Sequence, residues 1–139
     1  MKSKILIVTS HYYQKISKNL FEGAVRELDE KNISYDSISV PGTFEISLAI
    51  KHHINKGAYN GYIALGCIIK GETYHFEILS NECIRSINSL SIDNNIPIGF
   101  GVITCNNIQQ AEQRSYGPKN KGREAALACI KMINVLNNE

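Results

Sequence analysis

Short strand-like runs alternate with helix-like stripes along the chain, and this alternation limits the possible fold more than any other feature. The four strand-like runs are Ile5–Thr9, Tyr35–Val40, Gly61–Ile69 and Ile96–Thr104. The segments between and after them place apolar residues every three or four positions, which is the spacing of one helix face. Strands that alternate with helices in this way pair in parallel through right-handed crossovers, with helices on both faces of the sheet. The sequence therefore predicts an α/β fold around a four-stranded parallel sheet.

Five helices are predicted from these stripes and from the turn residues that bound them. Asn106-Asn107 is expected to cap a short fourth helix that ends near Arg114, and Gly117-Pro118 separates that helix from the last one. The residues expected to face the core are Ile16, Leu20, Ala24 and Leu28; Ile46, Ile50 and Ile54; Phe76, Leu79, Cys83, Ile87 and Leu90; and Ala125, Cys129, Met132 and Leu136.

The chain is expected to form a single domain over residues 1–139, because no linker, repeat or low-complexity segment divides it. Its net charge of +2 is too small to indicate a nucleic-acid partner. Its apolar stretches are well short of the roughly 20 residues that a transmembrane helix needs. Lys2 and Lys4 before Ile5–Val8 resemble the start of a signal peptide. However, His11-Tyr12-Tyr13 follows so soon that a first strand is the better interpretation.

The four cysteines, Cys67, Cys83, Cys105 and Cys129, each lie in an apolar pattern. None of them belongs to a Cys-x-x-Cys pair of the kind that binds metal or cycles between thiol and disulfide. Buried reduced thiols are therefore expected in place of a metal site. Reduced cysteines in turn indicate a cytoplasmic protein.

The carboxyl ends of the predicted strands carry residues that can bind and act on a small molecule. In an open parallel sheet, ligands bind at this edge. Aromatic rings, a carboxylate and a histidine are expected to meet there. The segments that contribute are Ser10–Tyr13, Pro41–Glu45, Lys70–His75 and Thr104–Asn107.

His75 stands where the third predicted helix begins, directly after a Gly-Glu-Thr turn. The first N–H groups of a helix have no partner within it and can bind an anion, and an imidazole titrates near neutral pH. Together these features indicate a small-molecule active site. Each residue also has a plainer interpretation: His75 could bond only to backbone, Glu45 could be an acid favoured by the helix dipole, and Tyr12 could be a packing residue.

A basic cluster precedes and begins the last predicted helix. Cations at a helix N-terminus oppose the helix dipole, which is the kind of local conflict that an anion site would explain. A solvated helix start is the alternative. The cluster consists of Arg114, Lys119, Lys121 and Arg123.

Four motifs, in order and with matching spacing, together resemble the 6,7-dimethyl-8-ribityllumazine synthase family. The resemblance extends from about Ile5 to Leu136, and its most specific pieces are Pro-Gly-x-Phe-Glu and Gly-Glu-Thr-x-His. The motifs are Val40–Ile46, Ala64–Phe76, Phe100–Thr104 and Asn120–Gly122.

The resemblance implies a flavodoxin-like three-layer sandwich and the penultimate step of riboflavin synthesis. In that step 5-amino-6-(D-ribitylamino)uracil condenses with 3,4-dihydroxy-2-butanone 4-phosphate to give 6,7-dimethyl-8-ribityllumazine, phosphate and water. It needs no metal and no redox cofactor. The family forms homopentamers, sometimes assembled into sixty-subunit shells, with each site between neighbouring subunits. Its partners are small-molecule substrates, so neither nucleic acid nor a membrane is expected.

The resemblance also implies a role for each matching residue, with His75 as the proton-transfer residue. Phe100 and Arg114 match residues that the adjacent subunit presents, so the anion of the basic cluster would belong to the neighbour's site. The residues that match the pyrimidine and ribityl site are Tyr12, Thr43, Phe44, Glu45, Cys67, Ile68, Ile69 and Phe100, and those that match the phosphate site are Glu72, Thr73, Arg114 and Lys121.

A non-catalytic flavin- or lumazine-binding protein on the same scaffold is the alternative function. It rests on the altered Tyr12-Tyr13 pair, which belongs to the His11-Tyr12-Tyr13 segment that replaces the family's commoner Arg-Phe-Asn. Such a protein would bind flavin tightly without turnover.

Overall fold

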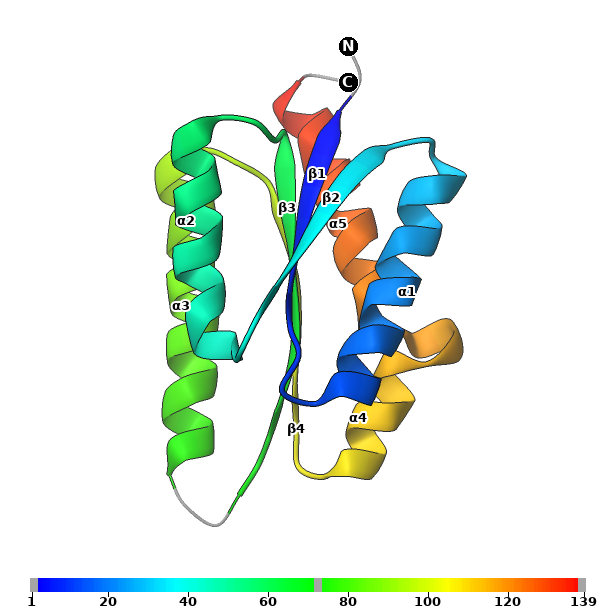
Figure 1. Ribbon diagram of the computed structural model, residues 1–139, viewed down its shortest axis with the longest axis vertical. Coiled ribbons are helices and arrows are strands. Elements are labelled where there is room, and N and C mark those ends of the chain that lie inside the picture. Colours follow the sequence, from blue (N-terminus) through cyan, green and yellow to red (C-terminus); the bar gives the residue numbers. More distant parts are fainter. Residues whose placement is uncertain (1–2, 72–73, 138–139) are drawn as a thin grey trace.

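The structure is a computed structural model that describes residues 3–71 and 74–137, and it has three layers (Figure 1). The middle layer is a parallel sheet in the strand order β2-β1-β3-β4. The predicted α/β class, with a four-stranded parallel sheet, is therefore confirmed. The strands are β1 (Lys4–Ser10), β2 (Ser34–Val40), β3 (Gly61–Ile69) and β4 (Ile98–Cys105).

Helices cover both faces of the sheet. In Figure 1, α2 and α3 lie on one side, and α1, α4 and α5 lie on the other. Single turns of 3-10 helix, Thr43–Glu45 and Gly117–Lys119, precede α2 and α5. The helices are α1 (Gln14–Glu30), α2 (Ile46–Lys56), α3 (His75–Asn94), α4 (Ile108–Ser115) and α5 (Lys121–Leu136).

Two apolar layers form because successive side chains of a strand point to opposite faces of the sheet. In β1, Ile5 and Ile7 pack toward α1 and α5, whereas Leu6 and Val8 pack toward α2 and α3. Nearly all of β3 is buried, as expected for a central strand that is covered on both faces. This arrangement brings the carboxyl ends of the four strands to one edge of the molecule.

The predicted apolar stripe of α5 is partly wrong. Ala125 and Cys129 are buried as expected, but Met132 and Leu136 are 43% and 41% exposed, and Ile133 is buried instead. With 3.6 residues per turn, a stripe through residues 125 and 129 continues at 133, so residues 132 and 136 lie on its flank. The predicted cap is confirmed, since the Asn107 side chain accepts a hydrogen bond from the Gln110 N–H at 2.9 Å.

The four cysteines are buried free thiols, as the sequence predicts. Within the described part of the chain, no cluster of three or more His, Cys, Asp or Glu residues could hold a metal ion. None of the helices described is long and apolar enough to cross a membrane.

Candidate active site

A cavity of about 340 Å³ opens at the carboxyl edge of the sheet, where the ends of three strands and the start of α3 meet. Residues distant in sequence line it together, and most of the predicted pyrimidine-site residues are among them. The lining residues are Tyr12, Tyr13, Gly42, Thr43, Phe44, Cys67, Ile68, Ile69, His75 and Leu79.

The backbone of β3 closely approaches the end of β1 and the segment after β2 because residue 66 is glycine. A Cβ atom at Gly66 would lie 2.3 Å from the hydroxyl oxygen of Ser10 and 3.0 Å from a methyl carbon of Thr43. The first separation is shorter than any van der Waals contact, so a larger residue would push these segments apart. Gly66 therefore allows Thr43 and the end of β3 to lie against the same cavity.

Two aromatic rings stand at the mouth of the cavity. Tyr12 is 75% exposed and Phe44 is 70% exposed, although both line it. The Tyr12 ring meets that of Tyr13 edge to face, with centroids 5.0 Å apart. Burial raises the pKa of Tyr13, with smaller contributions from Cys67 and Tyr12, so its phenol is neutral at pH 7. Such rings can stack on a flat heterocycle.

The floor of the cavity is neutral. Cys67 is 4% exposed, and burial raises the pKa of its thiol to about 12, with a further contribution from Cys105. Because a thiolate is the reactive form, Cys67 is not a nucleophile at pH 7. The end of β3 can instead offer its backbone N–H and C=O groups to a ligand.

Glu45 lies at the start of α2 and is exposed, next to the residues that line the cavity. One of its carboxylate oxygens lies against Gly42, 3.2 Å from where a Cβ atom would stand. Since Gly42 lines the cavity, the carboxylate is close enough to its rim to accept hydrogen bonds from a hydroxylated ligand.

His75 is the first residue of α3, and it lines the cavity together with Leu79, one turn further along. The predicted histidine thus meets Tyr12, Thr43 and Cys67 at one site. The predicted phosphate residues Glu72 and Thr73 lie outside the described residues, so these two assignments remain predictions.

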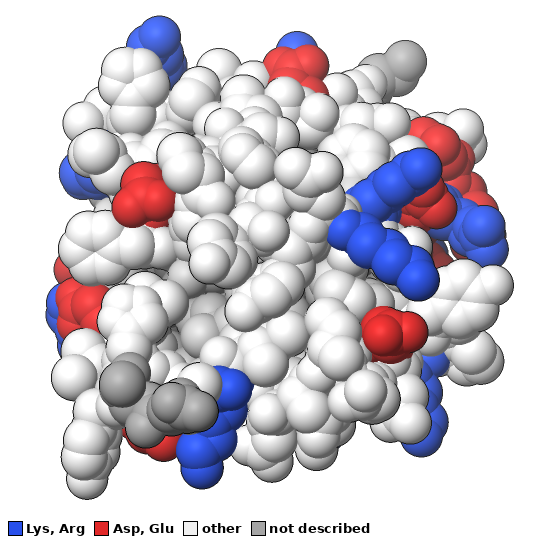
Figure 2. Space-filling view, turned by 60° about the horizontal axis from the view of Figure 1, so that its bottom comes forward, with Lys and Arg blue, Asp and Glu red and all other residues white. Residues whose placement is uncertain are grey.

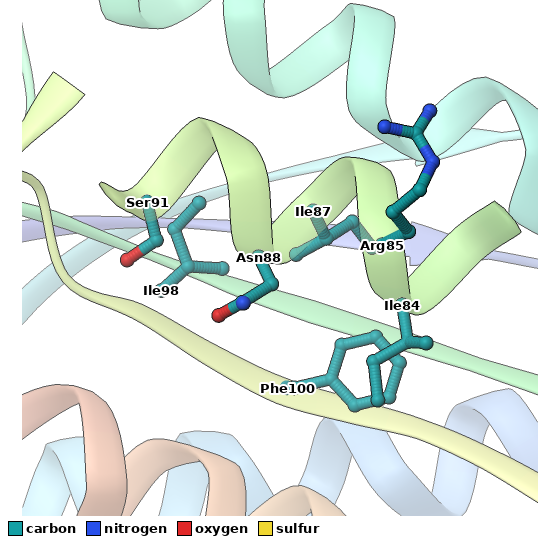
Figure 3. Close-up of a pocket in the computed structure, with 7 residues that line it drawn as sticks. All are labelled: Ile84, Arg85, Ile87, Asn88, Ser91, Ile98 and Phe100. Carbon is teal, nitrogen blue, oxygen red and sulfur yellow. The ribbon is translucent and has the colours of Figure 1, made fainter. Parts of the chain in front are cut away.

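Phe100 does not line this cavity. It lies on β4 in a separate groove of about 410 Å³, which Figure 3 shows between β4 and α3. The guanidinium of Arg85 points away from the Phe100 ring. The other residues that line the groove are the apolar Ile84, Ile87 and Ile98 and the polar Asn88 and Ser91. Phe100 therefore belongs to a different surface from that of His75.

Two cations of the basic cluster have carboxylate partners in their own chain. Lys121 pairs with Glu124 at 3.1 Å, and Arg123 pairs with Glu27 at 2.7 Å. Arg114, at the end of α4, is half-buried. On the face shown in Figure 2, Lys, Arg, Asp and Glu side chains lie mainly toward the periphery, around a broad centre formed by other residues.

Three lining residues, Tyr13, Gly42 and Leu79, were not among the predicted site residues. Leu79 carries a signal that could have identified it, because it lies four positions after His75 and so on the same face of α3. Tyr13 directly follows Tyr12 after β1, in a segment already expected at this edge of the sheet.

Comparison with known proteins identifies the family of this chain. The sequence model of the 6,7-dimethyl-8-ribityllumazine synthase family matches residues 2–137. The protein of that name from Bartonella tribocorum is 46% identical over 134 residues, which cover 95% of this chain and 89% of the relative. Those from Afipia carboxidovorans and Agrobacterium fabrum are 42% and 41% identical, over 96% of this chain and over 85% and 95% of their own lengths. The chain therefore belongs to the 6,7-dimethyl-8-ribityllumazine synthase family.

Proposed function

We propose that this protein is a transferase that condenses 5-amino-6-(D-ribitylamino)uracil with 3,4-dihydroxy-2-butanone 4-phosphate to give 6,7-dimethyl-8-ribityllumazine, phosphate and water. The observation that carries the proposal is the cavity, which brings His75 together with the aromatic mouth and the end of β3. An apolar cavity with a few polar groups and one imidazole suits a flat heterocycle with a hydroxylated chain.

Each residue has a role that the family resemblance implies and that its chemistry fits. Tyr12 and Phe44 would stack on or cover the pyrimidine ring, and the backbone of Cys67–Ile69 would bond to its edge. Glu45 would accept hydrogen bonds from the ribityl hydroxyls. Together these contacts orient the ring amine toward the ketone of the second substrate.

His75 would move the protons. The amine of the pyrimidine attacks the ketone, and loss of water gives an imine. Removal of a neighbouring proton then expels phosphate, and the second amine closes the ring with loss of a further water. Each step transfers a proton near neutral pH, where an imidazole is an efficient acid and base.

We infer that the protein works as a homo-oligomer with sites shared between subunits, in a pentamer that stands alone or builds a sixty-subunit shell. Phe100 and the cavity occupy different surfaces, so Phe100 could act on a ligand only in the cavity of a neighbouring copy. In addition, Ile78, Ile84 and Ile92 of α3 are exposed. Exposed apolar side chains of this kind are typical of a surface that is covered by another protein. Sedimentation velocity would test this: a monomer of 15.5 kDa would contradict it.

The phosphate site would combine Glu72 and Thr73 of one subunit with Arg114 and Lys121 of its neighbour. A guanidinium binds phosphate through charge-assisted hydrogen bonds, and a lysine adds positive charge. We also infer a cytoplasmic location, because four free cysteines suit a reducing compartment.

The experiment that tests the function is an anaerobic assay with both substrates, followed by the absorbance of the lumazine product. We expect product from the wild type, and a rate lower by about 100-fold at most in His75→Ala, since general acid–base catalysis is a modest contribution here. An unchanged rate would contradict the role of His75. Tight flavin binding without any product would favour the non-catalytic alternative.

A further inference from the structure

Arg114 differs from the paired cations of the basic cluster because its observed partners are uncharged. Its Nη1 donates to the side-chain oxygen of Gln110 at 3.3 Å and to the sulfur of Cys105 at 3.6 Å. Lys121 and Arg123 each meet a carboxylate instead. Among the residues that the structure describes, none forms an ion pair with Arg114. A guanidinium held by neutral acceptors keeps its full charge for an anion.

Gln110 is anchored independently of Arg114. Its side-chain oxygen accepts a second hydrogen bond, from the Asn106 N–H at 2.8 Å, and its own N–H donates to the Asn107 side chain at 2.9 Å. Both contacts bind it to the turn that joins β4 to α4. Because Gln110 and Arg114 are four residues apart on α4, they lie on the same helix face.

We propose that Gln110 is a positioning residue for the phosphate site: it fixes the Arg114 guanidinium at the carboxyl edge of the sheet without neutralising it. The inference rests on the proposed function, in which Arg114 binds the substrate phosphate. A carboxylate at position 110 could accept the same two hydrogen bonds, but it would compete with the phosphate for the guanidinium. The amide therefore fixes the position of Arg114 and leaves its positive charge available for the phosphate.

The test compares Gln110→Glu and Gln110→Met with the wild type. We expect Gln110→Glu to raise the KM for the butanone phosphate and the Kd for inorganic phosphate by about tenfold, while the KM for the pyrimidine is unchanged. Gln110→Met removes the acceptor and should shift the same two constants in the same direction. Gln113→Glu is the matched control, because it adds the same charge at an exposed position of α4.

Three results would overturn the positioning role. Wild-type constants in Gln110→Glu would make Gln110 only a turn-capping residue, because a carboxylate still accepts from Asn106. An equal rise in KM for both substrates would indicate a general structural effect. The same rise in both constants in Gln113→Glu would show that the added negative charge, and not its position, causes the effect.

The positioning role and the proposed function can fail separately. A wild type without product would refute the function, and titration with inorganic phosphate would then test Gln110 alone. In that titration, unchanged binding in Gln110→Glu overturns the positioning role, and binding about tenfold weaker supports it.

Discussion

At the scale of single residues, Asn120 connects three segments through one buried side chain. Its amide nitrogen donates to the carbonyl oxygens of Asn19 at 2.9 Å and Ser115 at 2.8 Å. Its oxygen accepts from the N–H groups of Gly122 at 2.8 Å and Arg123 at 3.1 Å, which caps α5. The side chain thus links α1, the end of α4 and the start of α5, and so sets where Arg114 and Lys121 lie relative to each other.

Asn120→Asp is expected to lower the free energy of unfolding by about 2 kcal/mol, because the carboxylate still caps α5 but leaves two carbonyl oxygens without their donor. Denaturant unfolding would measure the change. Asn55→Asp, at an exposed position of α2, is the matched control. Equal stability of the two variants would show that the donated hydrogen bonds contribute little.

Local features such as helix caps could be predicted from the sequence, but the partners of contacts between residues distant in sequence could not. The cap at Asn107 and the meeting of His75 with the aromatic segments follow from local pattern and from the rule that strand ends gather at one edge. The Asn120–Asn19 contact joins residues 101 positions apart, and no local pattern specifies which backbone oxygen a buried amide will reach. The same holds for Phe100, whose groove depends on how α3 packs beside β4.

At the scale of elements, a buried carboxylate links α1 to α5. The Glu27 side chain is 5% exposed, and it accepts hydrogen bonds from Lys31 at 2.9 Å and from Arg123 at 2.7 Å. The approach of the two helices is close, since a Cβ atom at Gly122 would lie 2.0 Å from the Leu20 carbonyl oxygen. Packing and the ion pairs therefore act together at this interface.

Glu27→Gln is expected to destabilise the protein by about 2 kcal/mol at pH 7, because both cations lose a charged acceptor. The hydrogen bond to Lys31 is the largest cause of the lowered pKa of Glu27, with Arg123 adding to it. The pKa of Glu27 is lower in the folded state than in the unfolded state. Its contribution to stability is therefore fully present above the ordinary glutamate pKa, and it is lost as pH falls through the pKa of the folded state.

Unfolding followed from pH 7 to pH 3 would test the contribution of Glu27. We expect the difference in free energy of unfolding between the wild type and Glu27→Gln to shrink as pH falls over the acidic part of that range. Glu30→Gln, at the exposed end of α1, should show no such difference. A constant difference across the series would mean that Glu27 acts by packing and not by charge.

At the scale of the whole molecule, the separation of His75 from Phe100 is the feature that the proposed function must explain. His75 belongs to the cavity, Phe100 belongs to the groove between β4 and α3, and Arg114 ends α4. The cavity and the groove that contains Phe100 therefore lie on different surfaces of one chain. A ring of identical subunits can complete each cavity with the next subunit's residues, because a head-to-tail interface joins two different surfaces of the same chain.

Shared sites predict complementation between two defective variants. In a His75→Ala oligomer every site lacks the imidazole, and in an Arg114→Ala oligomer every site lacks the guanidinium. When the two chains are unfolded together and reassembled at random, about a quarter of the sites receive both wild-type residues. We therefore expect the activity of the mixture to exceed the mean activity of the two separately reassembled variants, as measured by the lumazine absorbance assay. Activity equal to that mean would place both residues in one subunit's site and would contradict a site between subunits.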